Sequence, residues 1–455
     1  MSEPFTFGGE IVWKPLPEQI EHANLTRFMR LHAIQDFEHL MQRSTQDVAW
    51  FTDAVLKFLD IQFYQPYSKV VDLKEGIQFP KWCVDGKMNI VHNCVEKWTA
   101  DQEQQTALAF EGEEGTTRKL SYVELNREVN KAANALKSLG LGKGDAIGIF
   151  MPMTPEIVIA LLAIAKIGGI ILPLFSGYGA GAIVSRMVDA DAKALFAADG
   201  AFRRGKPVEM KSVADEAAEN IPSLKHMIVL KRTGQAINIK MKEGRDHWWH
   251  ELVDAQSDVC ETEKTSAEDP LMIIYTSGTT GKPKGALHTH CGFPVKAAQD
   301  MAFGTDVHRD DVIYWMTDMG WMMGPWLVFG SLLLGATIFL YDGAPDFPAP
   351  NRLWELAEKH KINQMGVSPT LIRSLIPHGD EHFKQHDLSS LKCFASTGEP
   401  WNPDPWMWLF EKVGGGRIPI INYSGGTEIS GGIVMGNMLL PLKPCAFSAA
   451  CPGMD

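Results

Sequence analysis

Helix and strand patterns alternate from about residue 105 onward, and this alternation constrains the fold more than any other feature. Ser121 and Glu124 have capping-box spacing, an apolar face then recurs at helical intervals, and Gly140 stands where a helix would stop. A buried strand is predicted at 146–150 and a further one at 170–174, with a helix between them. Such a βαβ succession predicts parallel sheets covered by helices.

The length of the chain implies more than one core. A chain of 455 residues is too long for a single compact hydrophobic core. Residues 256–270 are polar, acidic and rich in Ser and Thr, which is typical of a surface connection. We therefore expect two α/β halves joined near this segment.

A loop rich in glycine and hydroxyl residues follows the apolar strand predicted at 271–274. Glycines let a backbone approach phosphate oxygens closely, hydroxyl and N–H groups donate to those oxygens, and lysines supply positive charge. The pattern therefore predicts a nucleotide-phosphate site. The loop consists of Tyr275, Thr276, Ser277, Gly278, Thr279, Thr280, Gly281, Lys282, Pro283, Lys284 and Gly285.

This loop is not a Walker A loop. Only two residues separate Gly278 from Gly281, and the lysine is followed by Pro283 instead of Ser or Thr. Proline also disfavours a helical conformation in the residue before it. We therefore expect an extended, mobile loop, not a cradle at a helix start.

Several strands predicted in the second half also end in polar, glycine-rich loops. Residues 317–324, 397–400 and 424–428 each follow such a strand. Taken alone, 398–400 reads as an ordinary turn, and Thr427-Glu428 as a helix start with a favourable acidic residue. In open α/β sheets, however, ligands collect at the carboxyl ends of strands, so these loops are expected to converge.

Composition excludes several classes of protein. A net charge of −12 argues against generic nucleic-acid binding, and the longest apolar stretches, 157–175 and 326–341, are too broken to predict a membrane span. The seven cysteines show no Cys-x-x-Cys pair, which favours reduced thiols in a cytoplasmic protein. His288 and His290 would share a face of a strand as metal ligands can, but without a visible third ligand a structural role is favoured.

The loop at 275–285 resembles the phosphate-binding signature of the adenylate-forming superfamily. Residues 1–97 are similar to the N-terminal extension of the acetyl-CoA synthetase branch. The resemblance implies an α/β fold, namely the large N-terminal domain of these enzymes, with two doubly wound sheets sandwiched by helices. It implies a helical extension at 1–97, α/β subdomains at 98–268 and 269–440, and the start of a small β subdomain at 441–455.

The resemblance assigns an ATP site. Gly398, Glu399 and Pro400 match the segment along adenine, and Tyr423 or Ser424 stands near the position of the adenine-stacking aromatic residue. Lys284, Thr427 and Glu428 are the implied catalytic residues, with Glu428 as ligand to Mg²⁺. The implied ATP-binding loop residues are Thr276, Ser277, Gly278, Thr279, Thr280, Gly281 and Lys282.

The resemblance also assigns an acyl pocket. Its implied lining is Trp321, Met322, Met323, Thr397 and Gly425. Acetate-specific members carry a tryptophan at the position of Gly425. Removal of an indole opens space for several methylene groups, so we expect an acid larger than acetate.

The resemblance also assigns two segments to CoA binding. Phe175 and Gly177 match a Phe-Gly-Gly segment that contacts CoA, and Arg203 and Lys206 match two basic residues. By composition alone, the basic segment fits a solvated surface loop equally well.

The implied activity is that of an AMP-forming acyl-CoA synthetase, an acid–thiol ligase that uses ATP, Mg²⁺ and CoA. The alternatives are an adenylating domain that passes the acyl group to a carrier protein, and a non-catalytic nucleotide-binding remnant. Members of the family continue into a C-terminal domain with a catalytic lysine. The resemblance therefore predicts that this chain is an incomplete form and a poor catalyst alone.

Overall fold

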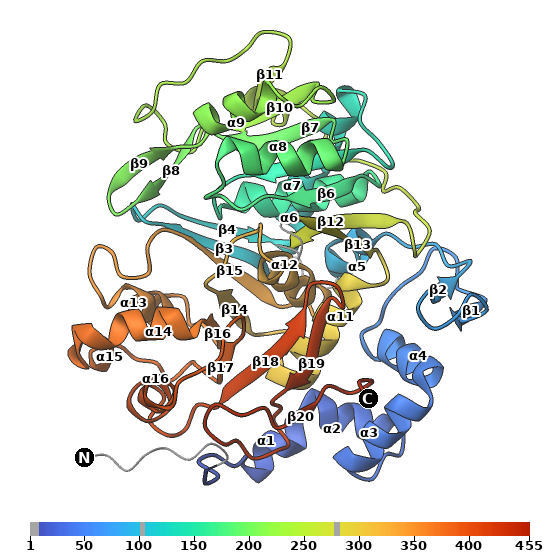
Figure 1. Cartoon of the computed structure of the whole chain (residues 1–455), viewed down its shortest axis with the longest axis vertical. Coiled ribbons are helices and arrows are strands. Elements are labelled where there is room, and N and C mark those ends of the chain that lie inside the picture. The colour runs from blue at the N-terminus through green and yellow to red at the C-terminus, as the bar shows by residue number, and fades with distance from the viewer. Residues whose placement is uncertain (1–8, 101–104, 277–282) are drawn as a thin grey trace.

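The protein is built from two large α/β units that lie one above the other with helices between them (Figure 1). The computed structural model describes residues 9–100, 105–276 and 283–455. In these ranges two large, mainly parallel sheets are present, together with two small hairpins. The parallel sheets predicted from the alternating pattern are therefore confirmed.

The first sheet has the order β11-β10-β7-β5-β6-β12-β13, and all neighbours are parallel except β12 and β13. Its strands are Asp246–Trp248 (β11), His226–Leu230 (β10), Ala194–Ala198 (β7), Ala146–Phe150 (β5), Ile170–Pro173 (β6), Pro270–Thr276 (β12) and Lys284–Thr289 (β13).

The second sheet has the order β20-β19-β18-β17-β16-β14-β15-β3-β4, with a parallel centre from β18 to β3 and antiparallel edges. Its strands are Ala449–Ala450 (β20), Gly431–Met435 (β19), Ile420–Gly426 (β18), Cys393–Ser396 (β17), Gln364–Val367 (β16), Val312–Trp315 (β14), Thr337–Asp342 (β15), Thr106–Gly112 (β3) and Thr117–Ser121 (β4).

Strand pairs are exchanged across residue 268, the boundary expected between the two α/β subdomains. Strands β3 and β4 precede that residue but pair in the second sheet, whereas β12 and β13 follow it but pair in the first. The two units are therefore tied together by strands as well as by packing. The subdomain boundaries themselves stay predictions.

A layer of helices lies between the sheets. Helix α6 packs on β3 and β4, α7 packs on β5 and β6, and these two helices contact each other. The helices are Pro17–His22 (α1), Asn24–Leu31 (α2), Phe37–Gln46 (α3), Val48–Phe58 (α4), Ile90–Cys94 (α5), Tyr122–Ser138 (α6), Pro155–Lys166 (α7), Ala180–Asp189 (α8), Lys211–Ala218 (α9), Trp249–Leu252 (α10), Phe293–Asp300 (α11), Met323–Leu333 (α12), Arg352–Lys359 (α13), Pro369–Leu375 (α14), Glu381–Lys384 (α15) and Pro403–Met407 (α16).

Local sequence signals set the ends of these helices. The Ser121 side chain accepts from the Glu124 N–H, and the Glu124 carboxylate accepts in return from the Ser121 N–H, so α6 begins with the predicted capping box. Gly140, just beyond the end of α6, has a φ of 77°, which glycine adopts without strain. Lys166 ends α7, which is apolar from Ile157 to Ala165, and its buried ammonium group pairs with Glu96.

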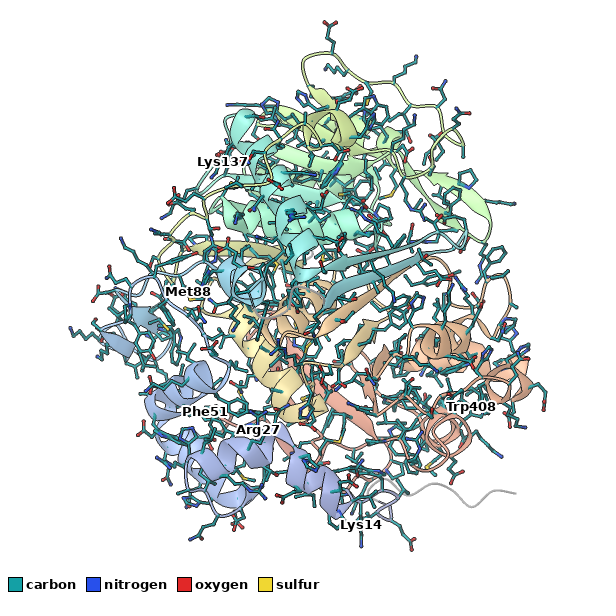
Figure 2. The ribbon with its side chains drawn as sticks, turned by 180° about the vertical axis from the view of Figure 1, so that it is seen from behind. Lys14, Arg27, Phe51, Met88, Lys137 and Trp408 are labelled. Carbon is teal, nitrogen blue, oxygen red and sulfur yellow. The ribbon has the colours of Figure 1, made fainter. Side chains whose placement is uncertain are left out.

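The N-terminal extension runs along one side of the molecule, where Figure 2 labels Lys14, Arg27, Phe51 and Met88. It contains α1 to α5 and a hairpin of Lys69–Asp72 (β1) and Lys81–Val84 (β2). The Phe28 ring lies 5.0 Å from that of Phe303, between ring centroids, so aromatic packing attaches the extension to the body of the protein.

None of the helices in the described ranges combines the length and apolar character that a membrane crossing requires. All seven cysteines are free thiols.

Candidate active site

Four neighbouring strands of the second sheet end at the same level and form the floor of a cavity. Trp315 of β14 pairs with Gly366, Val367 of β16 with Ser396, and Ser396 of β17 with Asn422. The residues that follow these strands enclose a cavity of about 550 Å³. Its lining is Trp315, Met316, Thr317, Trp321, Met322, Met323, Ser368, Thr397, Gly398, Glu399, Tyr423, Gly425, Gly426 and Thr427.

All five residues predicted for the acyl pocket line this cavity. Met323 is buried at the start of α12, Met322 is half-buried, and Trp321 is 55% exposed. The prediction did not include Trp315, Met316, Thr317 and Ser368, which also line it. Their position directly at strand ends was the available signal, because ligands collect there in α/β sheets.

The segment after β17, which is predicted to lie along adenine, forms one wall of the cavity. Gly398 has a φ of 95°, a conformation that other residues rarely adopt. This turn directs Glu399 towards α14, where its carboxylate accepts from the Thr370 N–H at 2.8 Å and from Arg373 at 2.7 Å. The backbone of this wall is therefore held by an ion pair. Pro400 is exposed and does not line the cavity.

Gly425 lies at an irregular point of the hairpin formed by β18 and β19, where the register shifts between Ser424 and Gly425. A Cβ atom at Gly425 would stand 1.8 Å from the carbonyl oxygen of Gly431. With this backbone geometry, no side chain can project from residue 425, so the cavity wall there is backbone only. The structure gives a local reason for the glycine.

Tyr423 and Ser424 differ in exposure. Tyr423 lines the cavity but is only 4% exposed, and its ring packs 5.7 Å from that of Trp326, between centroids. Ser424 is exposed. Stacking of adenine by either residue stays a prediction.

The ends of the glycine-rich loop lie beside the Thr427-Glu428 pair. Thr276 and Lys284 pair across the β12–β13 hairpin, and the Thr276 hydroxyl donates to a Glu428 carboxylate oxygen at 3.4 Å. Residues Ser277 to Lys282 lie outside the described residues, so their predicted phosphate contacts stay predictions. The strand predicted before the loop is confirmed as β12.

Glu428 has the properties that a magnesium ligand requires. Its carboxylate is exposed, and the Thr276 hydroxyl is its only hydrogen-bond donor among the described residues. Mg²⁺ takes oxygen ligands and is often held by one or two carboxylates together with substrate phosphates. Glu428 is therefore the residue that could hold Mg²⁺ together with substrate phosphates.

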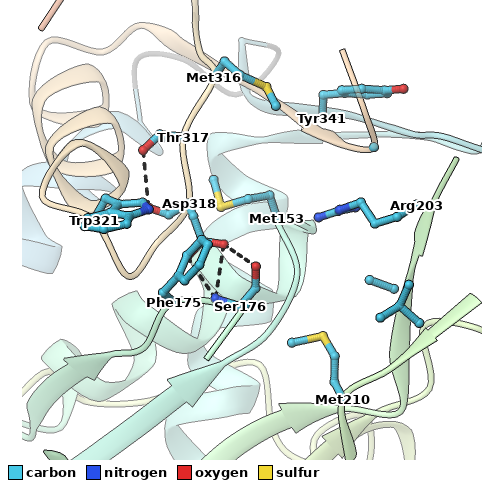
Figure 3. Close-up of a pocket in the computed structure, with 14 residues that line it drawn as sticks. Met153, Phe175, Ser176, Arg203, Met210, Met316, Thr317, Asp318, Trp321 and Tyr341 are labelled. Atoms are coloured by element: carbon cyan, nitrogen blue, oxygen red, sulfur yellow. Dashed lines mark hydrogen bonds between the residues drawn. The ribbon is translucent and has the colours of Figure 1, made fainter. Parts of the chain in front are cut away.

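A second cavity of about 470 Å³ lies on the other side of the loop that carries Trp321 (Figure 3). Phe175, Gly177 and Arg203, three of the residues predicted for the CoA side, line it, and their contact with CoA stays a prediction. The Arg203 guanidinium pairs with the buried carboxylate of Asp342 at 2.6 Å. Lys206 pairs with Arg203 across the β8–β9 hairpin (Gly200–Arg203 and Lys206–Glu209) but is exposed and not part of the lining.

The two histidines on β13 have separate structural partners. The Nδ1 of His288 lies 3.0 Å from the Ser430 hydroxyl, and the Nδ1 of His290 accepts from the Ile90 N–H at 3.2 Å. Burial lowers the pKa of each imidazole to about 4, because the charged form would lose its hydration. These contacts agree with the structural role that the sequence favoured.

The strand-end cavity, the neighbouring hairpin loop and the doubly wound sheets describe a nucleotide-type α/β site. Residues 95–451 match the family described as "AMP-binding enzyme", and residues 37–94 match the acetyl-coenzyme A synthetase N-terminus. The chain therefore belongs to the AMP-binding enzyme family, as the resemblance predicted.

The chain is similar to several acetyl-coenzyme A synthetases. It is 40% identical to that of Methanothrix thermoacetophila over 96% of this chain and 66% of the relative, and 39% identical to that of Escherichia coli K12 over 87% and 61%. The solved structure of acetoacetyl-CoA synthetase from Streptomyces lividans superposes with a TM-score of 0.91 at 28% identity, covering 98% of this chain and 69% of that one. The chain thus spans about two thirds of the length of these relatives.

Proposed function

We propose that the protein is an AMP-forming acyl-CoA synthetase that converts a carboxylic acid, ATP and CoA into acyl-CoA, AMP and pyrophosphate. The observation that carries the proposal is the single cavity bounded by Thr397–Glu399, Tyr423–Thr427 and Met316–Met323. Residues predicted for the adenine wall and residues predicted for the acyl pocket line this one cavity, which supports the proposal. Such proximity is what a reaction between a carboxylate and the α-phosphate of ATP requires.

The first step joins the acid to the nucleotide. A carboxylate oxygen attacks the α-phosphorus of ATP, the bond to the β,γ-phosphates breaks, and acyl-AMP and pyrophosphate form. Lys284 at the start of β13 and Thr276 at the end of β12 flank the loop, and we propose that both contact the phosphates. Their role is charge stabilisation and positioning, which dominate phosphoryl-type transfer.

The second step transfers the acyl group to sulfur. The CoA thiolate attacks the acyl carbon, and AMP leaves with the bonding electron pair. The cavity lined by Phe175, Gly177 and Arg203 is the proposed approach for CoA, because it shares a wall with the acyl cavity. The match of residues 37–94 to the acetyl-coenzyme A synthetase N-terminus favours CoA over a carrier protein as acceptor.

We propose an acid longer than acetate. The wall at Gly425 is backbone only, and the flexible Met322 and Met323 face the same space. The relatives in the sequence comparison are acetyl-coenzyme A synthetases, whereas the similar solved structure is an acetoacetyl-CoA synthetase. Similar proteins are therefore named for acids of two and of four carbons.

Acyl-sulfamoyl adenosines, stable mimics of acyl-AMP, test the chain length without turnover. Affinity measured by calorimetry should rise from the acetyl to the butanoyl compound by about fourfold per methylene, as expected for about 0.8 kcal/mol per buried CH₂. Tightest binding of the acetyl compound would contradict the longer acid while leaving the reaction class intact. Failure to bind any member of the series would contradict the reaction class.

Replacement of Glu428 by Gln tests the nucleotide end of the site. The variant should bind ATP about tenfold more weakly in the presence of Mg²⁺, because the amide is a poor ligand for a hard cation. The increase in ATP affinity that Mg²⁺ gives the parent protein should largely disappear. Titration calorimetry with and without Mg²⁺ measures both. Glu411→Gln, an exposed change away from the cavity, is the matched control. Equal Mg²⁺ dependence in the E428Q variant and the parent protein would exclude this role.

A further inference from the structure

The acyl cavity and the second cavity are separated by one loop. Met316, Thr317 and Trp321 line both cavities, so residues 316–321 form the partition between them. The loop follows β14 of the second sheet, and it faces the Phe175–Gly177 turn that follows β6 of the first sheet (Figure 3). The partition therefore lies at the contact between the two α/β units.

Asp318 joins the two sides of this contact. Its side chain is buried, with 8% of the residue exposed. One carboxylate oxygen accepts from the Gly320 N–H at 2.8 Å, and the other accepts from the Ser176 hydroxyl at 2.5 Å. The Ser176 N–H lies 3.3 and 3.4 Å from the two oxygens. The Asp318 carboxylate thus binds Gly320 of its own loop and Ser176 of the facing turn.

The backbone packing around Asp318 leaves little freedom. A Cβ atom at Gly320 would lie 2.0 Å from the Phe175 backbone nitrogen, so the loop and the turn are in direct backbone contact. The rings of Phe175 and Trp321 lie 5.4 Å apart, between centroids. We therefore expect a change in the Asp318–Ser176 contact to shift Phe175 and Trp321, two of the aromatic residues that border the second cavity.

We propose that Asp318 and Ser176 are positioning residues for the thioester-forming step, because they fix the partition past which the CoA thiol must reach the acyl carbon. This inference rests on the proposed function. Neither side chain needs to touch the reacting atoms. The pair instead sets the width and orientation of the passage between the two cavities.

A carboxylate suits this task better than an amide. Three donors converge on Asp318, two from Ser176 and one from Gly320. An asparagine offers a single acceptor oxygen and turns an NH₂ group towards one of these donors. The Arg203 guanidinium lines the same cavity, but its ion-pair partner is Asp342 and not Asp318. The direct contact of the Asp318 carboxylate across the two units is the one with Ser176.

Equilibrium binding to the full chain tests the proposal without turnover. Calorimetry would measure the affinity for CoA and for butanoyl-sulfamoyl adenosine in the parent protein, Ser176→Ala and Asp318→Asn. We expect CoA affinity to fall about tenfold in each variant, with the adenosine compound bound within about twofold of the parent, as for loss of one hydrogen bond to a charged group. Ser185→Ala is the matched control, because Ser185 is exposed on α8 and, among the described residues, its side chain hydrogen-bonds only within that helix.

The outcomes separate this inference from the proposed function. Suppose that the parent protein binds both ligands. If the variants then keep the affinity for both ligands, or lose it equally for both, the positioning role is overturned and the proposed function stands. A parent protein that binds neither ligand would overturn both. Ser176→Ala removes only one hydroxyl, so we expect this variant to fold. It therefore tests the proposal even if Asp318→Asn lowers the stability of the protein. The double variant should lose no more CoA affinity than D318N alone if the two residues act as one contact.

Discussion

At the scale of single residues, polar groups inside this protein are held by specific partners. Glu96 accepts hydrogen bonds from Lys166, Thr262 and His92, and although burial alone would raise its pKa, these partners lower it to about 2. His288 and His290 instead stay neutral inside the fold, since burial lowers their pKa to about 4. The lysine that interrupts an apolar stretch in the sequence is therefore explained by an ion pair.

The buried histidines predict a loss of stability in mild acid. Their pKa is about 4 in the folded state and about 6.5 when unfolded, so the unfolded chain binds more protons between these values. Each histidine should then lower the free energy of unfolding by up to about 1.4 kcal/mol per pH unit as the pH falls from about 6.5 towards 4. Urea denaturation across pH 4.5–7.5 measures this slope.

His290→Asn isolates one of the two contributions. The amide oxygen can still accept from the Ile90 N–H, as His290 Nδ1 does, but the group does not titrate. The slope below pH 6.5 should become shallower in the variant, and the comparison at pH 7.5 gives the cost of the substitution itself. Identical slopes would show that His290 does not contribute.

At the scale of elements, the β18–β19 hairpin connects the core to the site. Asp300 of α11 accepts from the Gly432 N–H at 2.8 Å and pairs with Lys296 at 2.5 Å, so a buried carboxylate anchors the hairpin from behind. Burial raises the pKa of Asp300, against the opposing effect of Lys296. The hairpin in turn carries Gly425 and Thr427 to the cavity.

Gly425→Ala should destabilise this hairpin. A methyl group would stand 1.8 Å from the Gly431 carbonyl oxygen, so the two strands must separate, at a cost of about 1–3 kcal/mol. Gly181→Ala is the matched control, because its Cβ has open space inside α8 and alanine favours a helix by up to about 1 kcal/mol. Urea denaturation compares the two. Equal stability of both variants would mean that the hairpin adjusts without cost.

At the scale of the whole molecule, charged groups link the two α/β units. Asp342 at the end of β15 is fully buried and pairs with Arg203 and Arg232, and Arg232 also pairs with Glu114 at 2.7 Å. Arg203 is the last residue of β8 and Arg232 follows β10 (both before residue 268), whereas Asp342 belongs to the second sheet. This network lies at the border of the second cavity, which Arg203 lines.

Asp342→Ala should weaken the association of the units. Loss of a buried partner leaves two guanidinium groups without their shared carboxylate, which costs about 3–5 kcal/mol. Asp346→Ala removes a neighbouring aspartate that pairs with an arginine side chain 63% exposed, and should cost no more than about 1 kcal/mol. Guanidinium-induced unfolding measures both. A cost for D342A no greater than that for D346A would contradict a linking role.

Much of the fold was predictable because it depends on local patterns. The capping box at Ser121, the strand at 146–150 and the strand before the glycine-rich loop each depend on a few consecutive residues, and the structure has them where predicted. The exchange of strands between sheets was not predictable, because pairing of β3 with β15 joins segments more than two hundred residues apart. Periodicity within a segment carries no information about its distant partner.

The sequence by itself determined the α/β class, the family and part of the cavity lining, because strand-end loops with glycine, hydroxyl and acidic groups are chemically specific. Only the tertiary structure decided what surrounds them. It placed Gly425 against the Gly431 carbonyl, turned Arg203 towards Asp342 and brought Asp318 onto Ser176. These relations depend on how two sheets and their helices pack, and packing is a property of the whole chain and not of any one segment.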